Sequence, residues 1–381
     1  MSTLLRFVVL YGLMYAAFGV SSPFLPAFLA SRGLTPEQLG IFFAAGTAVR
    51  LVSGPACGRL ADRTRALGAV LAVCTALAAL VALGLVSASG FPALLLIGVL
   101  HAAALAPITI LADALALAAA DRRFEYGWVR GTGSAVFIVG TLLSGQIVGG
   151  WGLASILVLQ AALLTGAAGA ARLVPEPDRS ETAPTLGASA PSGGALELLR
   201  MPRFRRVMLV SALVLGSHAM HDAFAVIRWS AAGLTPAVAS VLWSESVAAE
   251  VVVFFLIGPA LVTGLGPAGV VALAATAGLL RWVVMAVTAD VAALALVQPL
   301  HGLTFAALHL ACMRLIQAIV PTRLAATAQA MYALGAAATT ALLTLVSGRL
   351  YAALGAEGFL VMALLCAAAI AVAPGLRSPR R

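Results

Sequence analysis

Charged residues are scarce in this chain of 381 residues, and lysine is absent altogether. Only 10% of the residues are charged and 62% are hydrophobic, against about 25% charged for a typical soluble protein. The mean hydropathy is +1.06. This composition excludes a water-soluble protein built around a single core.

Cysteine is also rare, and the four cysteines show no CxxC motif and no Cys/His ligand spacing. Cys57, Cys74, Cys312 and Cys366 all lie inside apolar runs, where a thiol behaves as a small hydrophobic group. We therefore expect no disulfide framework, no metal site and no cofactor. The GxSxG, HExxH and Walker patterns of enzymes and nucleotide-driven pumps are absent as well, so we do not expect an enzyme.

Long apolar runs, rich in Ala, Leu, Val and Gly, dominate the sequence. They lie near residues 4–29, 37–57, 66–87, 91–118, 129–150, 153–174, 204–228, 235–257, 267–288, 291–318, 324–346 and 353–373. A membrane-spanning helix needs about 20 residues, so each run is long enough to cross a bilayer. An outer-membrane barrel would instead show short strands of alternating polarity. We therefore expect an all-α membrane protein with twelve transmembrane helices.

Residues 175–202 separate the first six runs from the last six. This stretch is rich in Pro, Ser, Gly, Ala and charge, and such a composition cannot bury enough apolar area to fold alone. We therefore predict an N-terminal half at 1–174, a linker at 175–202 and a C-terminal half at 203–381.

The net charge of +9 comes from arginine, since all 23 basic residues are arginines. They are scattered at the ends of apolar runs and form no single basic face, which argues against a nucleic-acid partner. Assigning loops to alternate sides puts sixteen arginines on one face and only Arg32, Arg228 and Arg349 on the other. By the positive-inside rule, we expect both termini and the linker to be cytoplasmic, in a multi-pass protein of a bacterial inner membrane.

The two halves repeat one another at an offset of 200 residues. Gly33-Leu34-Thr35-Pro36 recurs as Gly233-Leu234-Thr235-Pro236, and Leu100-His101 recurs as Leu300-His301. We therefore expect two parallel six-helix repeats. Such repeats are related by an axis along the membrane normal, with a substrate path between them near the midplane.

A short motif, Gly58-Arg59-Leu60-Ala61-Asp62-Arg63, follows the run at 37–57. It resembles the G-x-L-a-D-R loop of the major facilitator superfamily, and the resemblance extends over essentially the whole chain. It implies the major facilitator fold. Asp62 and Arg63 would then form gating contacts that stabilise one conformation of the transporter.

Further residues resemble the phenylpropionate permease branch of that superfamily, which is related to lactose and nucleoside proton symporters. They are Pro23-Phe24-Leu25-Pro26, Asp113-Ala114-Leu115, Tyr126-Gly127-Trp128-Val129-Arg130, Ser217-His218-Ala219, Trp229, Leu242-Trp243, Ala249-Glu250, Arg281-Trp282, Gln298-Pro299-Leu300-His301-Gly302-Leu303-Thr304-Phe305 and His309. The resemblance implies proton-coupled uptake of a small organic anion such as phenylpropionate.

Ionisable residues inside the apolar runs are the candidates for proton coupling, because each costs about 2.5–3.5 kcal/mol to insert at the bilayer centre. In the resembling symporters an acidic residue and a histidine of the C-terminal half couple proton to substrate. The resemblance assigns that role to Glu250 and His301, and with less support to Glu245 and His309.

His218 and Asp222 are four residues apart and share one helical face. A carboxylate beside an imidazole favours the protonated imidazole, so we expect this pair to take part in proton coupling. The alternative is that these polar groups only hold helices together.

Arg281 and Arg50 are the candidates for binding a substrate carboxylate, because a guanidinium can bind one in a bidentate manner. Arg50 and Glu250 occupy equivalent places in the two repeats. For Arg281, permanent pairing with Asp222 or Glu250 is the alternative. Two further residues, Trp243 and Trp282, could stack on an aromatic ring.

Asp113 and Arg130 fall at similar depths in adjacent runs, so we expect an ion pair between them that gates the cytoplasmic mouth or contacts substrate. Together these features predict a monomeric secondary active transporter that imports a small organic anion with protons by alternating access. Two alternatives stay open: a proton-antiport exporter of hydrophobic compounds or metabolites, and a non-transporting sensor with a transporter fold.

Overall fold

A computed structural model describes residues 2–120, 124–176 and 194–376 of the chain. Within these ranges the regular structure is entirely helical, and no strand occurs. The contacts between helices divide the chain into two compact units. The first comprises Met1–Pro184 with Gly233–Val241, and the second Thr185–Ala232 with Leu242–Arg381. The predicted boundaries at 1–174, 175–202 and 203–381 stay predictions, and residues 177–193 of the linker lie outside the described ranges.

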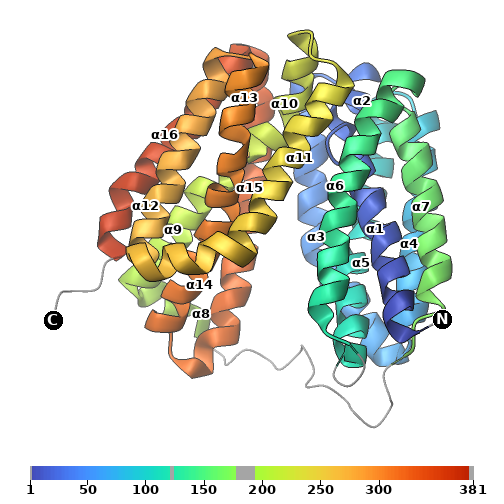
Figure 1. Cartoon of the computed structure of the whole chain (residues 1–381), viewed down its shortest axis with the longest axis horizontal. Coiled ribbons are helices and arrows are strands. Elements are labelled where there is room, and N and C mark those ends of the chain that lie inside the picture. The colour runs from blue at the N-terminus through green and yellow to red at the C-terminus, as the bar shows by residue number, and fades with distance from the viewer. Residues whose placement is uncertain (1, 121–123, 177–193, 377–381) are drawn as a thin grey trace. The chain divides into compact units, whose positions relative to one another are not determined.

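The helices of the first unit follow one another with short connections. They are α1 (Thr3–Ser21), α2 (Leu25–Ser31), α3 (Pro36–Thr64), α4 (Leu67–Ser87), α5 (Phe91–Ala120), α6 (Tyr126–Trp151) and α7 (Ser155–Ala171). Helix α1 packs against α6 and α7, and α5 packs against α3 and α4 (Figure 1).

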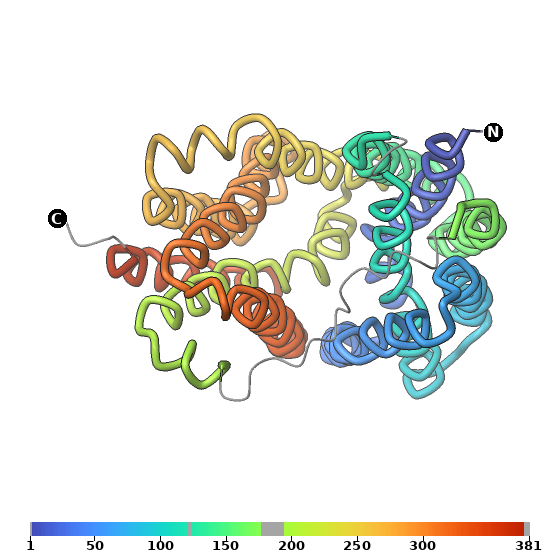
Figure 2. Tube along the Cα trace, turned by 90° about the horizontal axis from the view of Figure 1, so that it is seen from below, coloured from blue at the N-terminus to red at the C-terminus, as the bar shows by residue number. Residues whose placement is uncertain are grey.

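The second unit contains more interruptions. Its elements are α8 (Gly194–Arg200), α9 (Pro202–Gly216), α10 (Ala219–Ala231), the part of α11 (Pro236–Val252) from Leu242 onward, η1 (Val253–Ile257), α12 (Gly258–Val287), α13 (Val291–Val297), η2 (Gln298–Leu300), η3 (Leu303–Ala307), α14 (Leu308–Ile319), η4 (Thr322–Leu324), α15 (Ala325–Leu354), η5 (Gly355–Gly358), α16 (Phe359–Val372) and η6 (Ala373–Leu376). Helix α12 packs against α14 and α16, and α9 packs against α15 and α16 (Figure 2).

Twelve membrane-crossing segments can be counted among the described residues. Nine helical stretches are long and apolar enough to cross a membrane, and Ser155–Ala171 is a shorter apolar helix. Two of the nine stretches are each long enough to contain two spans. The stretch Pro236–Val287 has a non-helical residue at Gly266, next to Pro267, and the stretch Thr322–Leu376 turns at Gly355. The expected all-α membrane architecture with twelve spans is therefore confirmed.

Some of the expected spans are broken where the sequence suggested continuous helices. The run at 4–29 is divided between α1 and α2 at residues 22–24, and the run at 204–228 is divided at Ser217–His218. The run at 235–257 does not end at 257, because the helix continues through η1 into α12 as far as the kink at Gly266. Apolarity alone marks a span but not its internal breaks.

The internal repeat is visible in the turns and in the helix ends. Gly33 and Gly233 both have a φ of +88°, a conformation that glycine adopts without steric cost. Arg6 Nη1 donates to the Leu173 carbonyl at 3.0 Å, and Arg206 Nη1 donates to the Gly375 carbonyl at 3.0 Å. In each unit, an arginine near the start of the first span thus satisfies a carbonyl just beyond the last one.

Each unit has its own apolar core, which includes the first helix of its repeat. In α1, Phe7, Leu10 and Met14 are 0% exposed. At an offset of 200 residues, Val207 and Val214 of α9 are also 0% exposed and belong to the second core. The same helical stripe therefore points inward in both units.

Candidate functional site

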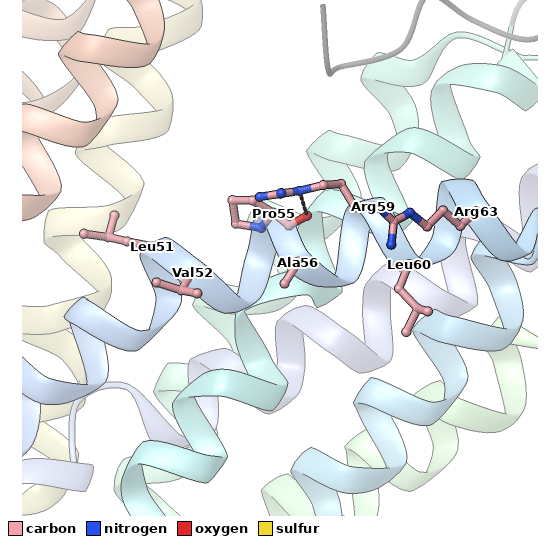
Figure 3. A pocket seen from close by; sticks show the side chains of 7 residues that line it. All are labelled: Leu51, Val52, Pro55, Ala56, Arg59, Leu60 and Arg63. Carbon is pink, nitrogen blue, oxygen red and sulfur yellow. Dashed lines mark hydrogen bonds between the residues drawn. The ribbon is translucent and has the colours of Figure 1, made fainter. Parts of the chain in front are cut away.

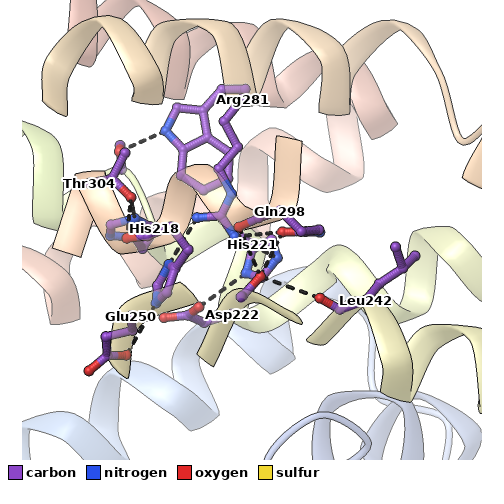
Figure 4. A network of polar contacts seen from close by, with 12 residues as sticks. His218, His221, Asp222, Leu242, Glu250, Arg281, Gln298 and Thr304 are labelled. Carbon is purple, nitrogen blue, oxygen red and sulfur yellow. Dashed lines mark hydrogen bonds and ion pairs between the residues drawn. The ribbon is translucent and has the colours of Figure 1, made fainter. Parts of the chain in front are cut away.

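Arg281 of α12 is the centre of a polar network in the second unit (Figure 4). Its side chain is 0% exposed. Nη1 donates to His301 Nδ1 at 3.0 Å, and Nη2 donates to Gln298 Oε1 at 2.7 Å and contacts His221 Nε2 at 3.3 Å. Neutral acceptors thus surround this buried cation.

No ion pair joins Arg281 to a carboxylate among the described residues. The alternative that Arg281 pairs permanently with Asp222 or Glu250 is therefore wrong for this conformation. Instead of a carboxylate, the side-chain amide oxygen of Gln298, a residue of η2, accepts from the guanidinium. Ser246 of α11 donates to the same Gln298 oxygen at 3.0 Å.

Glu250 and His301 lie side by side, as their expected role in one proton-coupling centre requires. The distance from His301 Nε2 to Glu250 Oε2 is 3.6 Å, and the two side chains are 16% and 31% exposed, respectively. A neutral His301 accepts the Arg281 hydrogen bond at Nδ1, so its own hydrogen lies on Nε2 and faces Glu250. Arg281, His301 and Glu250 therefore form one continuous polar chain.

His218 and Asp222 keep the expected four-residue spacing, since Asp222 N donates to the His218 carbonyl at 2.9 Å. Their side chains nevertheless have other partners. His218 Nε2 contacts Thr304 Oγ1 at 2.9 Å, and Asp222 Oδ1 contacts His221 Nδ1 at 3.3 Å. The His218–Thr304 contact joins the residue that precedes α10 to η3, which fits the alternative that some of these groups hold helices together.

Both tryptophans of the predicted site pack against this network. Trp282 is 0% exposed, donates from Nε1 to Ser217 Oγ at 2.8 Å, and its ring centroid lies 4.6 Å from Arg281 Cζ. Trp243 is 9% exposed and stacks on the His221 ring at 5.1 Å. Substrate stacking by Trp243 and Trp282 stays a prediction.

Two π-helical segments follow the Glu250 and His301 positions along the chain. Segment η1 begins three residues after Glu250, and η3 begins two residues after His301. Isolated π-helical turns occur frequently at functional sites. Between them the two backbones nearly touch, because a Cβ on Gly302 would lie 2.6 Å from the Ala249 carbonyl oxygen. Gly302 therefore permits the close approach beside the Glu250–His301 pair.

Glu245 and His309 do not join the network. Glu245 has neither a hydrogen bond nor an ion pair in the described part of the chain. His309 stacks on Phe254 at 6.2 Å and meets Tyr332 edge-on at 5.8 Å. The π-helical segment between His301 and His309 changes the angle that regular helical spacing would give. Their coupling roles stay predictions.

In the first unit, Asp113 of α5 is held by tyrosines. Asp113 Oδ1 accepts hydrogen bonds from Tyr11 at 2.5 Å and from Tyr126 at 2.9 Å. The predicted ion pair between Asp113 and Arg130 is therefore wrong, because the two hydroxyl groups satisfy the carboxylate instead. Arg130 Cζ lies 5.0 Å from the centroid of the Tyr15 ring, and its buried Nη1 has no hydrogen-bond partner in the described part of the chain.

The remaining predicted residues of this unit lie on α3. Asp62 and Arg63 are exposed near its end, and Asp62 forms no ion pair with any described residue. A cavity of about 640 Å³ runs beside this helix (Figure 3) and is lined by Leu51, Val52, Pro55, Ala56, Arg59, Leu60 and Arg63. None of the histidines lines it. Gating by Asp62, Arg63, Asp113 and Arg130 stays a prediction.

No role was predicted from the sequence for several partners in these networks. They are uncharged polar residues inside spans: Tyr11, Tyr126, Ser217, Ser246, Gln298 and Thr304. A search for ionisable groups overlooks them, although glutamine is an unusual residue in an apolar run. Among the described residues, no group of three or more His, Cys, Asp or Glu side chains could hold a metal ion.

Comparison of the sequence with protein families gives a match over nearly the whole chain. The MFS_1 like family matches residues 4–361. A protein of Escherichia coli (strain K12) named "Probable 3-phenylpropionic acid transporter" is 29% identical over 371 residues, covering 96% of this chain and 95% of that protein. The "Uncharacterized transporter YwbF" of Bacillus subtilis (strain 168) is 23% identical over 325 residues, with 84% and 80% coverage.

Comparison with solved structures shows the same fold. The nucleoside transporter NupG superposes with a TM-score of 0.86 at 17% identity, covering 99% of this chain and 98% of that one. A bacterial homologue of the human lysosomal transporter Spinster, inward-facing and unoccupied, gives a TM-score of 0.74 at 17% identity, with 99% and 98% coverage. At this identity the likeness concerns the fold alone.

Proposed function

The chain belongs to the MFS_1 like family of major facilitator transporters, which are not enzymes, and from this premise we propose that it is a proton-coupled symporter. Its substrate would be 3-phenylpropionate or a related aromatic acid, taken up by alternating access. The family resemblance and the major facilitator fold expected from the sequence are confirmed. The chain is thus a membrane transporter of a small molecule.

The observation that carries the proposal of proton coupling is the chain from Arg281 through His301 to Glu250. The cation at one end is fully buried, whereas the Glu250 side chain at the other end is 31% exposed. Glu250 is the proposed proton acceptor, with His301 beside it. Glu250 contacts His301, which accepts from Arg281, and Asp222 also acts electrostatically on the guanidinium. Protonation of Glu250 therefore removes one of the negative charges around the buried cation. The protonated carrier therefore favours an anion, and this links proton binding to anion binding.

The contacts of Arg281 favour a role within the coupling chain over direct contact with substrate. Both terminal nitrogens already donate to described side chains, and the guanidinium has no exposed surface. Arg281 would fix the orientation of His301, and through it the hydrogen that faces Glu250.

The proposed substrate class rests on the Escherichia coli relative, which shares 29% identity with this chain over nearly its full length. The rings of Trp243 and Trp282 lie beside the network, and both are buried in this conformation. We further propose cytoplasmic termini, on the basis of the uneven distribution of arginine between the two loop faces. The monomeric state and the bacterial inner membrane expected from the sequence stay predictions.

Uptake by purified protein in liposomes tests the proposal. Labelled 3-phenylpropionate, with benzoate and a nucleoside for comparison, is supplied with an inward proton gradient, an outward gradient and no gradient. The wild type should accumulate 3-phenylpropionate only with the inward gradient. Glu250→Gln should abolish accumulation, because an amide cannot take up the proton, and exchange of internal for external substrate should persist.

Glu197→Gln is the matched control, because Glu197 lies on α8 and pairs with Arg323 away from the network. It should accumulate substrate like the wild type. Transport against the proton gradient would favour an exporter, and binding without flux would favour a sensor. Absence of both transport and binding of every acid would refute the proposed substrate class.

A further inference from the structure

Arg50 is an intramembrane cation for which the described residues offer no partner. It lies fourteen residues from either end of α3, so it belongs near the bilayer centre. Its side chain is exposed and makes no hydrogen bond or ion pair with a described residue. An arginine at this depth is costly unless it faces water or meets an anion.

Two buried polar atoms near Arg50 also have no hydrogen-bond partner among the described residues. Ser53 Oγ and His101 Nε2 are both inaccessible to solvent and form no hydrogen bond with any described residue, and His101 is only 4% exposed. A buried polar group without a partner costs about 1–3 kcal/mol, so two of them together suggest that a ligand completes the site.

Helical geometry brings these groups to one interface within the first unit. Gly46, Arg50 and Ser53 are spaced i, i+4 and i+7, and they therefore share one face of α3. That face packs against α5, because a Cβ on Gly46 would lie 3.4 Å from Ala102 Cβ. Ala102 follows His101, and the charge of Arg50 acts on the His101 ring. The three unpartnered groups thus lie along the same contact between helices.

The internal repeat provides an independent comparison. At an offset of 200 residues, Arg50 corresponds to Glu250 and His101 corresponds to His301. In the second unit this pair is in contact at 3.6 Å. The first unit repeats the arrangement with an arginine in place of the acid, so the same framework that holds a proton acceptor in one repeat presents a cation in the other.

We propose that Arg50, Ser53 and His101 form the subsite that binds the carboxylate of the substrate. The proposal rests on the proposed function and names the part of the substrate that each group recognises. The guanidinium binds the carboxylate through charge-assisted hydrogen bonds, while the serine hydroxyl and the imidazole N–H donate to its remaining lone pairs. The substrate class is a monocarboxylate, with its apolar part outside this subsite.

The other intramembrane arginines fit this role less well. Arg130 and Asp113 both act electrostatically on the Tyr15 hydroxyl, so the Asp113 carboxylate lies close enough to Arg130 to repel an incoming anion. Arg281 is fully buried and already donates from both terminal nitrogens. Arg50 is exposed and has no acid among its described contacts.

The experiment compares a carboxylate with its neutral amide. Equilibrium binding of 3-phenylpropionate and of 3-phenylpropanamide is measured by calorimetry on purified full-length protein. The wild type should prefer the acid. Arg50→Gln should weaken binding of the acid by about 10- to 100-fold, the loss of one hydrogen bond to a charged group, and should leave binding of the amide unchanged. His101→Gln and Ser53→Ala should each give a smaller loss in the same direction.

Arg314→Gln is the matched control, because Arg314 is an exposed arginine within α14 that has no described hydrogen bond. It should keep the preference for the acid. Unchanged binding of the amide shows that a variant is folded, and Arg50→Lys, which keeps the charge, should recover part of the preference if Arg50→Gln does not fold.

Retention of the preference by Arg50→Gln, with its loss in Arg130→Gln or Arg281→Gln, would overturn this assignment while leaving the proposed symport intact. A wild type that binds the acid no better than the amide would refute the proposed substrate class and this subsite together.

Discussion

Replacing Gly302 with alanine should separate Glu250 from His301 without removing either group. The added Cβ would lie 2.6 Å from the Ala249 carbonyl oxygen and 2.8 Å from Val253 Cγ2. An ordinary contact requires at least 3.4 Å, so the two backbones must move apart by about 0.8 Å, at a cost of about 1–3 kcal/mol for overpacking. If the pair moves with the backbones, its 3.6 Å contact lengthens beyond ion-pairing distance.

The assay is gradient-driven accumulation of 3-phenylpropionate in liposomes, measured beside exchange of internal for external substrate. A partly exposed ion pair is worth about 1 kcal/mol, so accumulation by Gly302→Ala should fall about fivefold. Exchange needs no net proton movement and should stay within a factor of about two, which is roughly 0.4 kcal/mol. A merely structural role for Gly302 would lower both activities together.

Gly140→Ala is the matched control for strain between helices. A Cβ on Gly140 would lie 2.9 Å from the Ala16 carbonyl oxygen, at a contact between α6 and α1. The Glu250–His301 pair belongs to the other unit, so accumulation and exchange should change in parallel in this variant. Full accumulation by Gly302→Ala, or an equally selective loss in Gly140→Ala, would refute the reasoning.

Two further predictions concern stability in detergent, measured by thermal unfolding. Tyr126→Phe removes one of two donors to Asp113 and should destabilise the protein by about 1 kcal/mol, with a larger loss when Tyr11→Phe is added; an unchanged melting temperature in the double variant would contradict the hydrogen-bond assignment. Glu197→Gln breaks the exposed pair with Arg323 and should cost less than about 1 kcal/mol, so a large fall in its melting temperature would show that the pair matters more than its exposure indicates.

Much of the fold could be predicted from the sequence because the signals are local. Runs of about 20 apolar residues mark spans, and the Gly-Leu-Thr-Pro turns mark the repeat, since Gly33 and Gly233 share the same backbone conformation. The internal breaks were less visible. Nothing in the apolar pattern shows that the helix continues past residue 257 until Gly266, because a π-helical segment is as apolar as its surroundings.

The candidate site was predicted only in part, because the partner of a side chain depends on the neighbouring helix. Glu250 and His301 do meet, as the family resemblance implied. Asp113 and Arg130 do not form the predicted ion pair, because two tyrosine hydroxyls donate hydrogen bonds to the Asp113 carboxylate. No spacing within a single helix could reveal that Tyr11, more than a hundred residues away, supplies one of them.

The sequence by itself determined the membrane class, the number of spans and the repeat, because these depend on apolar length and on glycine turns that act locally. Only the tertiary structure decided which polar and charged groups contact one another. Arg281 has neutral acceptors and no carboxylate partner among the described residues, and Gly302 lets two helices approach closely enough for Glu250 to reach His301. The physical reason is that a buried polar group takes the partner its neighbouring helices present to it, and helix packing sets which helices are neighbours.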